Sequence, residues 1–97
     1  MSKFDQAKLV MKARKLQKEL QNEIIVVEAG EGAVTVEITG EQKLKKVNIN
    51  PDYVDLDDIG QLEGWIEEAV KEAINQSQKL AAEKMQPIMG SLGDLGL

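Results

Sequence analysis

Residues 24–50, IIVVEAGEGAVTVEITGEQKLKKVNIN, decide the fold of this 97-residue chain. A run of β-branched residues at 24–27 is followed by the run 34–38, in which apolar residues recur at every second position, and by the run 44–50, in which Val47 and Ile49 have the same spacing. This composition and period are typical of strands that bury one face. The connections are short and contain glycine, as Gly30-Glu31-Gly32 and Gly40-Glu41-Gln42. Since glycine supplies the positive φ that tight hairpins need, we predict a three-stranded antiparallel meander.

The residues before this stretch have the pattern of an amphipathic helix. Leu9, Ala13, Leu16 and Leu20 follow a spacing of four, three and four residues, as in a coiled-coil seam, and no proline interrupts residues 2–23. The opposite side carries five bases: Lys8, Lys12, Arg14, Lys15 and Lys18. Phe4 and Met11 also fall on this basic side, which an ordinary amphipathic helix does not explain.

A second helix is predicted after the strands. Pro51 ends the third strand, and Asp57 or Asp58 is a good N-cap for the helix. Its apolar stripe consists of Ile59, Leu62, Ile66, Ala69, Val70, Ala73, Ser77, Leu80 and Ala81. We expect the helix to end near Gln86, because the residue before a proline is disfavoured in the α region. The predicted fold class is α+β, helix–β–β–β–helix, with one domain over 1–86 and a flexible Gly-rich tail over 87–97.

The charges are distributed unevenly along the chain. The first 22 residues have a net charge of +4, residues 52–72 have a net charge of −7, and the whole chain has −5. A basic segment attached to an acidic body indicates an arm that binds a polyanion. The calculated pI of about 4.7 would by itself argue against nucleic acid.

Catalytic and metal-binding functions find no support in the residue types. The chain contains neither cysteine nor histidine, which removes thiolate chemistry, zinc fingers and the commonest general base. The acids between 52 and 58 lack the alternating ligands and the central glycine of a calcium loop. We therefore expect no enzyme activity, no catalytic or metal site, no cofactor and no small-molecule substrate. The sequence offers no signal peptide and no membrane span, which favours a cytoplasmic protein.

The order and spacing of these pieces resemble the YbaB/EbfC family of bacterial nucleoid-associated DNA-binding proteins. The resemblance covers roughly residues 8–86 and rests on the stretches 27–36, 44–51, 57–59, 62–69 and 82–85, together with the Gly40 turn and Ala73. It implies a tweezer-shaped homodimer whose helical arms approach double-stranded DNA with little sequence preference. It also implies a place in the nucleoid, changes in DNA conformation, and a role in regulating gene expression.

The site residues follow from charge and helix geometry. The DNA-binding candidates are Lys8, Lys12, Arg14, Lys15 and Lys18, with Lys43, Lys45 and Lys46 as auxiliaries. Protection of an edge strand by charge explains the second group equally well. Two amphipathic helices offer more apolar surface than one face of the sheet covers, which predicts burial against a second copy. The expected dimer interface comprises Leu9, Ala13, Leu16, Leu20, Ile66, Val70 and Leu80.

Two other functions remain open from the sequence. A protein–protein interaction module could dock a partner through the amphipathic helices, with the acidic surface repelling DNA. A basic amphipathic helix could also bind a membrane surface. Two features argue against this: the apolar stripe of the first helix lacks tryptophan, and the sheet needs this stripe for packing. An enzyme is the weakest alternative, because no paired carboxylates and no activated serine are evident.

Overall fold

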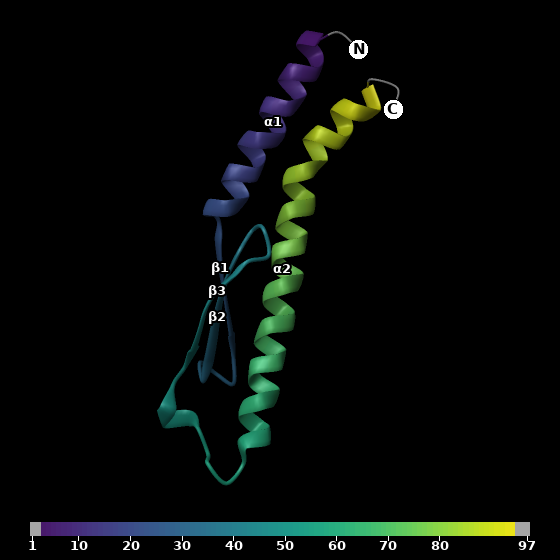
Figure 1. The fold of residues 1–97 in the computed structure, drawn as a ribbon. Helices are drawn as coiled ribbons and strands as arrows, with labels where there is room; N and C mark the ends of the chain where they lie inside the picture. Colours follow the sequence, from purple (N-terminus) through teal and green to yellow (C-terminus); the bar gives the residue numbers. More distant parts are fainter. Residues whose placement is uncertain (1–2, 95–97) are drawn as a thin grey trace.

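The computed structural model describes residues 3–94. Its elements are α1 (Lys3–Asn22), β1 (Ile24–Ala29), β2 (Val34–Thr39), β3 (Leu44–Ile49), the 3₁₀ turn η1 (Pro51–Tyr53) and α2 (Ile59–Asp94). The strands form one antiparallel sheet in the order β1-β2-β3 (Figure 1). The predicted α+β fold class and the three-stranded meander are confirmed.

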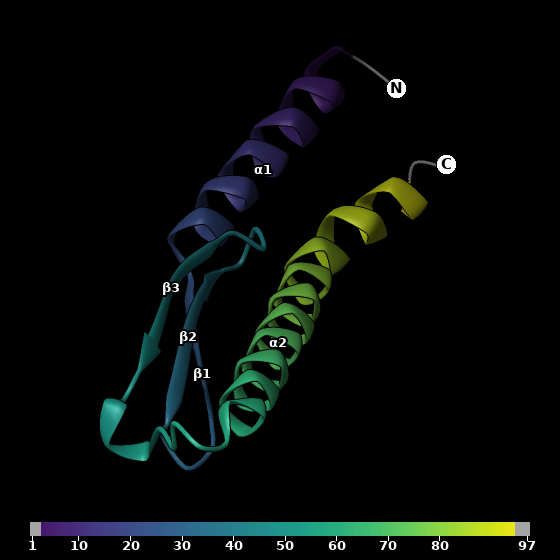
Figure 2. The same cartoon turned by 60° about the horizontal axis from the view of Figure 1, so that its bottom comes forward.

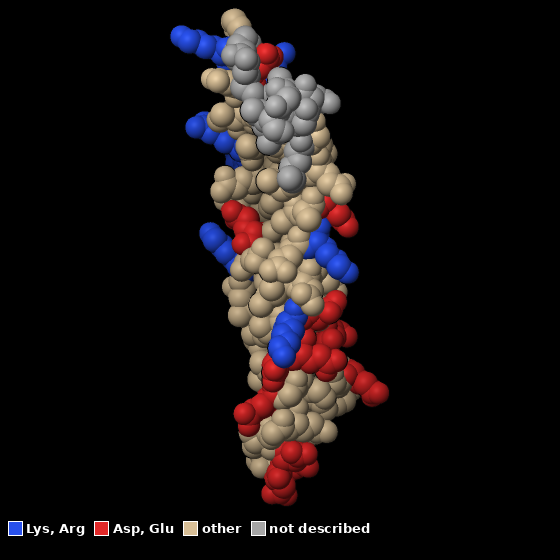
Figure 3. Space-filling model, turned by 90° about the vertical axis from the view of Figure 1, so that its right-hand side faces the viewer, with Lys and Arg blue, Asp and Glu red and all other residues tan. Residues whose placement is uncertain are grey.

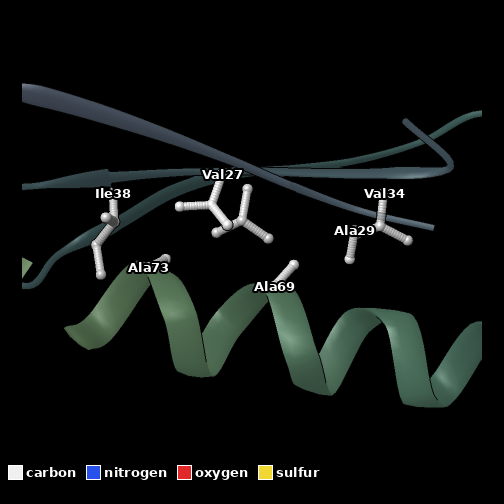
Figure 4. Packing of buried hydrophobic residues seen from close by; sticks show 7 residues of the cluster. Val27, Ala29, Val34, Ile38, Ala69 and Ala73 are labelled. Carbon is white, nitrogen blue, oxygen red and sulfur yellow. The ribbon is translucent and has the colours of Figure 1, made fainter. Parts of the chain in front are cut away.

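The core lies between the sheet and the first half of α2. Helix α2 packs on β1 and β2, where small Ala69 and Ala73 let the helix approach the strands closely. Figure 4 shows their methyl groups pointing toward Val27 and Ile38. Val34 and Val36 of β2 and both alanines are fully buried. Side chains of alternate residues therefore form one buried face, as period two requires.

The two hairpin turns use glycine for different reasons. At the first turn Gly30 has a φ of 63°, and Trp65 lies where a Cβ would stand. At the second turn the positive φ belongs to Gln42, so the expectation that Gly40 supplies it was wrong. A Cβ on Gly40 would lie 2.8 Å from the carbonyl oxygen of Leu20. Glycine is needed there because the end of α1 touches the turn.

A buried hydrogen bond ties α2 to the second turn. The Ser77 hydroxyl donates to the Thr39 carbonyl over 2.8 Å, and Ser77 is fully buried. The Thr39 hydroxyl in turn accepts the backbone N–H groups of Glu41 and Lys43 over 3.2 Å each. These contacts fix the turn on the helix.

Helix α2 begins where the sequence predicted and ends later. Asp58 caps it, since its carboxylate accepts the N–H of Gln61 over 3.3 Å. The predicted end near Gln86 was wrong, because the helix continues through Pro87 to Asp94. Residues 87–94 of the expected tail are thus helical, and residues 95–97 lie outside the described residues.

Tertiary packing explains the longer helix. Ala81, Met85 and Ile88 recur at four and three residues and line a cleft facing α1. Continuing the helix keeps Ile88 on this side. The bias against helix before proline is local, and contacts with α1 oppose it.

The molecule is elongated. It measures 65 × 20 × 15 Å, and its radius of gyration is 18.7 Å, against about 13 Å for a compact chain of this length. In Figures 1 and 2, α1 and the last part of α2 extend side by side beyond the sheet, and the two ends of the chain lie at the same end. The two helices form one projecting arm.

Candidate nucleic-acid interface

The predicted basic residues of α1 are all exposed on the arm. Leu16 and Leu20 are the buried residues of α1, and they line the cleft toward α2. The five bases lie elsewhere around the helix, and two of them, Lys12 and Lys15, border a hollow beside α2. The five residues Lys8, Lys12, Arg14, Lys15 and Lys18 are exposed. All five predicted cations of this helix are thus open to a partner.

The structure adds a sixth base, Lys84, which sequence reasoning missed. Lys84 of α2 lines a small hollow, of about 180 Å³, together with Lys12, Lys15 and Glu19 of α1. Its Nζ lies 3.8 Å from the Glu19 carboxylate, and both side chains are partly exposed. No periodicity in the sequence relates residue 84 to residue 19. Only the antiparallel packing of the two helices brings this lysine to the basic side of the arm.

The second basic group lies on the edge strand of the sheet. Lys45 and Lys46 belong to β3, Lys43 precedes it, and all three are exposed. Lys46 stands opposite Glu37 in the register, an opposite-charge pairing that favours a sheet. The turn before β3 touches the end of α1, since the Gly40 N–H donates to the Leu20 carbonyl over 2.9 Å. This group therefore lies near the base of the arm and also protects an edge.

Acids gather at the opposite end of the molecule. On the face shown in Figure 3, Asp and Glu side chains concentrate around the lower half, where α2 begins. Within α2, Lys71 contacts Glu67 over 2.7 Å. The hydrogen bond to this ammonium, and then its charge, lower the pKa of the exposed Glu67 carboxyl. The charge therefore differs between the two ends of the long axis: the projecting arm is positively charged, and the end where α2 begins is negatively charged.

The residues expected at a dimer interface are distributed over three environments. Leu16 and Leu20 are buried within the single chain, 7% and 8% exposed, so they need no partner. Ala13 is exposed and lines the cleft of about 430 Å³ between the two helices. The remaining four are half-buried: Leu9, Ile66, Val70 and Leu80. Their role in a dimer stays a prediction.

The structure also reveals an apolar surface that the sequence did not single out. Val47 and Ile49 stand opposite Val36 and Val34, so they share the buried face of the sheet, yet they are 39% and 38% exposed. On α2, Gln76 and Leu80 lie beside Ile25 of β1, which turns the other flank of the helix toward β3. We call the resulting surface the open apolar face: Leu44, Val47, Ile49, Ile66, Val70 and Ile74.

Other kinds of site find little support in residues 3–94. Within that range, no three Asp or Glu side chains gather closely enough to hold a metal ion. None of the described helices combines the length and the apolar character needed to cross a membrane.

Comparison with known proteins agrees with this arrangement. The model of the YbaB/EbfC DNA-binding family matches residues 1–92. The chain belongs to this family. It is a family of DNA-binding proteins and not a class of enzymes.

Proteins named as nucleoid-associated are similar to this chain along most of their length. A nucleoid-associated protein of Ruminiclostridium cellulolyticum is 40% identical over 81 residues, which cover 84% of this chain and 70% of that protein. A nucleoid-associated protein of Chloroflexus aurantiacus is 38% identical over 82 residues, which cover 84% of this chain and 82% of that protein. The crystal structure of the uncharacterized protein HP0035 from Helicobacter pylori shares the fold, with a TM-score of 0.77 at 14% identity. The structural match covers 86% of this chain and 87% of the Helicobacter pylori chain.

Proposed function

We propose that this chain is a nucleoid-associated protein that binds double-stranded DNA through the basic side of α1. The observation that carries the proposal is the exposure of five cations on one projecting helix, in a chain that belongs to a DNA-binding family. The names of its relatives support a place in the nucleoid. Changes in DNA conformation, and through them in gene expression, are the expected consequences.

Binding is expected to go through phosphates. Four of the five proposed binding residues on α1 are lysines, which suit single phosphates better than bidentate guanine contacts. Lys43, Lys45 and Lys46 extend this surface toward the sheet. The acidic start of α2 repels the duplex and so limits contact to the arm.

We also propose that the protein acts as a homodimer. The open apolar face holds six large apolar residues that are exposed or half-buried, and a second copy would remove them from water. Leu9 and Leu80 could add to this contact. Two arms would then engage DNA together, which raises the effective affinity without new contacts.

A gel-shift titration with random-sequence duplex over a salt series tests the DNA-binding proposal. Two arms would neutralise on the order of four to eight phosphates, so log K should fall with log salt with a slope of about −4 to −7. A flat response, or strong preference for one short sequence over random competitor, contradicts binding through phosphates.

A matched pair of variants locates the site. Lys8→Glu with Lys12→Glu should lower the affinity at least ~10-fold at moderate salt, because each lost contact no longer releases counterions. Lys71→Glu with Lys79→Glu changes the net charge equally but lies on α2, outside the basic side of the arm. If the two pairs lower the affinity alike, the net charge sets the affinity and the basic side of α1 is not the site; if the α1 pair binds as wild type, an interaction module becomes the better explanation.

A further inference from the structure

The basic side of α1 carries two large apolar side chains that are largely exposed. Phe4 is 82% exposed and Met11 is 70% exposed. Seven residues apart on a helix, they lie on the same side, with roughly 10 Å of axial rise between them. Exposed apolar surface that is rimmed by polar residues marks a contact with another molecule.

Their position within the basic side is central. At about 100° per residue, Lys8 and Lys15 fall on one side of the line through Phe4 and Met11, whereas Arg14 and Lys18 fall on the other. The buried Leu16 lies far round the helix, facing α2. Phe4 and Met11 therefore cannot reach the core of their own chain, and cations flank them on both sides.

We propose that Phe4 and Met11 act as apolar wedges that enter a groove of the duplex, partly unstack the base steps there, and bend the DNA. This inference rests on the proposed function. A wedge needs an apolar side chain that phosphate contacts hold against the duplex, and phenylalanine and methionine both serve in this way. The flanking cations supply those contacts on either side. The spacing of the two side chains matches roughly three base-pair steps of about 3.4 Å each.

Charge decides between DNA and the other possible occupants. The same surface of a second copy would bring two basic sides together, which is repulsive. A membrane-bound helix needs a broad apolar stripe opposite its cations. Here the stripe opposite the cations includes Leu16 and Leu20, which are buried within the chain. A polyanion with apolar base faces between its phosphates fits both the cations and the two side chains.

The test compares Phe4→Ala/Met11→Ala with Val10→Ala. Val10 is another exposed apolar residue of α1, 50% exposed, but lies outside the line of Phe4 and Met11. End-to-end energy transfer on a 30-base-pair duplex reports the bend, and 2-aminopurine fluorescence reports unstacking. The double variant should lose most of both signals and about 3- to 10-fold in affinity, with an unchanged salt slope. Val10→Ala should behave as wild type.

Several outcomes would overturn the wedge. It fails if the wild type leaves the duplex straight and stacked, or if the double variant bends it equally well. It also fails if the double variant instead loses binding to vesicles with 20% phosphatidylglycerol, or loses self-association, while its DNA signals persist. The Lys8→Glu/Lys12→Glu pair separates the two proposals. If that pair binds as wild type, the proposed DNA site fails; if it loses binding while the wedge variant still bends, only the wedge fails.

Discussion

Gly40 and Gly64 show how differently two glycines of one chain are constrained. Any side chain at Gly40 would meet the backbone of Leu20, with the nearest atom 2.8 Å away. At Gly64, inside α2, no atom lies within 4 Å of an added Cβ. The first glycine is required by a contact between elements. The second only adds flexibility to the unfolded chain and weakens the helix.

Replacing each glycine by alanine should therefore change stability in opposite directions. Gly40→Ala should lower the free energy of unfolding by about 1–3 kcal/mol, because the end of α1 must move away from the turn. Gly64→Ala should raise it by roughly 0.5–1 kcal/mol, the usual gain within a helix. Urea unfolding at a fixed protein concentration measures both. Equal stability of Gly40→Ala and wild type would show that the close approach is not needed.

At the scale of elements, the arm is a pair of antiparallel helices joined by apolar and ionic contacts. Leu16 and Leu20 are buried on its inner side. On its outer side Glu19 pairs with Lys84 across the helices. Glu19 borders the same hollow as Lys12 and Lys15, so one carboxylate both holds Lys84 and repels phosphate.

Neutralising Glu19 should strengthen DNA binding. Glu19→Gln removes a negative charge from the basic side and frees Lys84, so the affinity at low salt should rise roughly 2- to 5-fold. Lys84→Gln should lower it by a similar factor. Stability should change by no more than about 0.5 kcal/mol, since the pair is solvent-exposed.

Glu83→Gln provides the control. This substitution removes the same charge as Glu19→Gln, but Glu83 lines a different hollow, beside Ile25. Gel shift at one salt concentration compares the variants. If Glu83→Gln strengthens binding as much as Glu19→Gln, the effect is one of net charge and not of the hollow.

At the scale of the whole molecule, α2 covers only part of one face of the sheet. Helix α2 covers β1 and β2, whereas β3 keeps its apolar side chains exposed. A chain of this size buries only about 60–65% of its unfolded surface, so it gains much from a partner. We expect the open apolar face to be the contact between two copies.

Val47→Asp and Val26→Asp form a matched test of this contact. Both valines lie in the sheet and are exposed, 39% and 55%, but Val47 belongs to the open apolar face and Val26 to the outer face, opposite Glu37. Val47→Asp should weaken the dimer at least ~10-fold, because the contact would bury an unpaired charge. Val26→Asp should leave the dimer intact.

Sedimentation equilibrium at low micromolar concentration measures the mass, and circular dichroism verifies that the helices remain. A wild-type monomer with intact helices would refute the dimer. Dissociation by Val26→Asp alone would move the contact to the outer face.

The sequence by itself determined the elements whose signals are local. The period-two runs predicted the three strands to within about two residues, and Asp58 was named among the N-cap candidates. The family was identified from the order of these pieces. The five exposed bases on one side of α1 also follow from helix period alone, because neighbours on a helix surface are close in sequence.

Only the tertiary structure decided the features that depend on residues far apart in the chain. Gly40 is required by Leu20, α2 extends past Pro87 where Ile88 faces α1, and Lys84 joins the basic side through Glu19. The exposure of β3 depends on which strands α2 covers. Each of these results from a packing contact between separate elements, and local sequence preferences carry no information about such contacts.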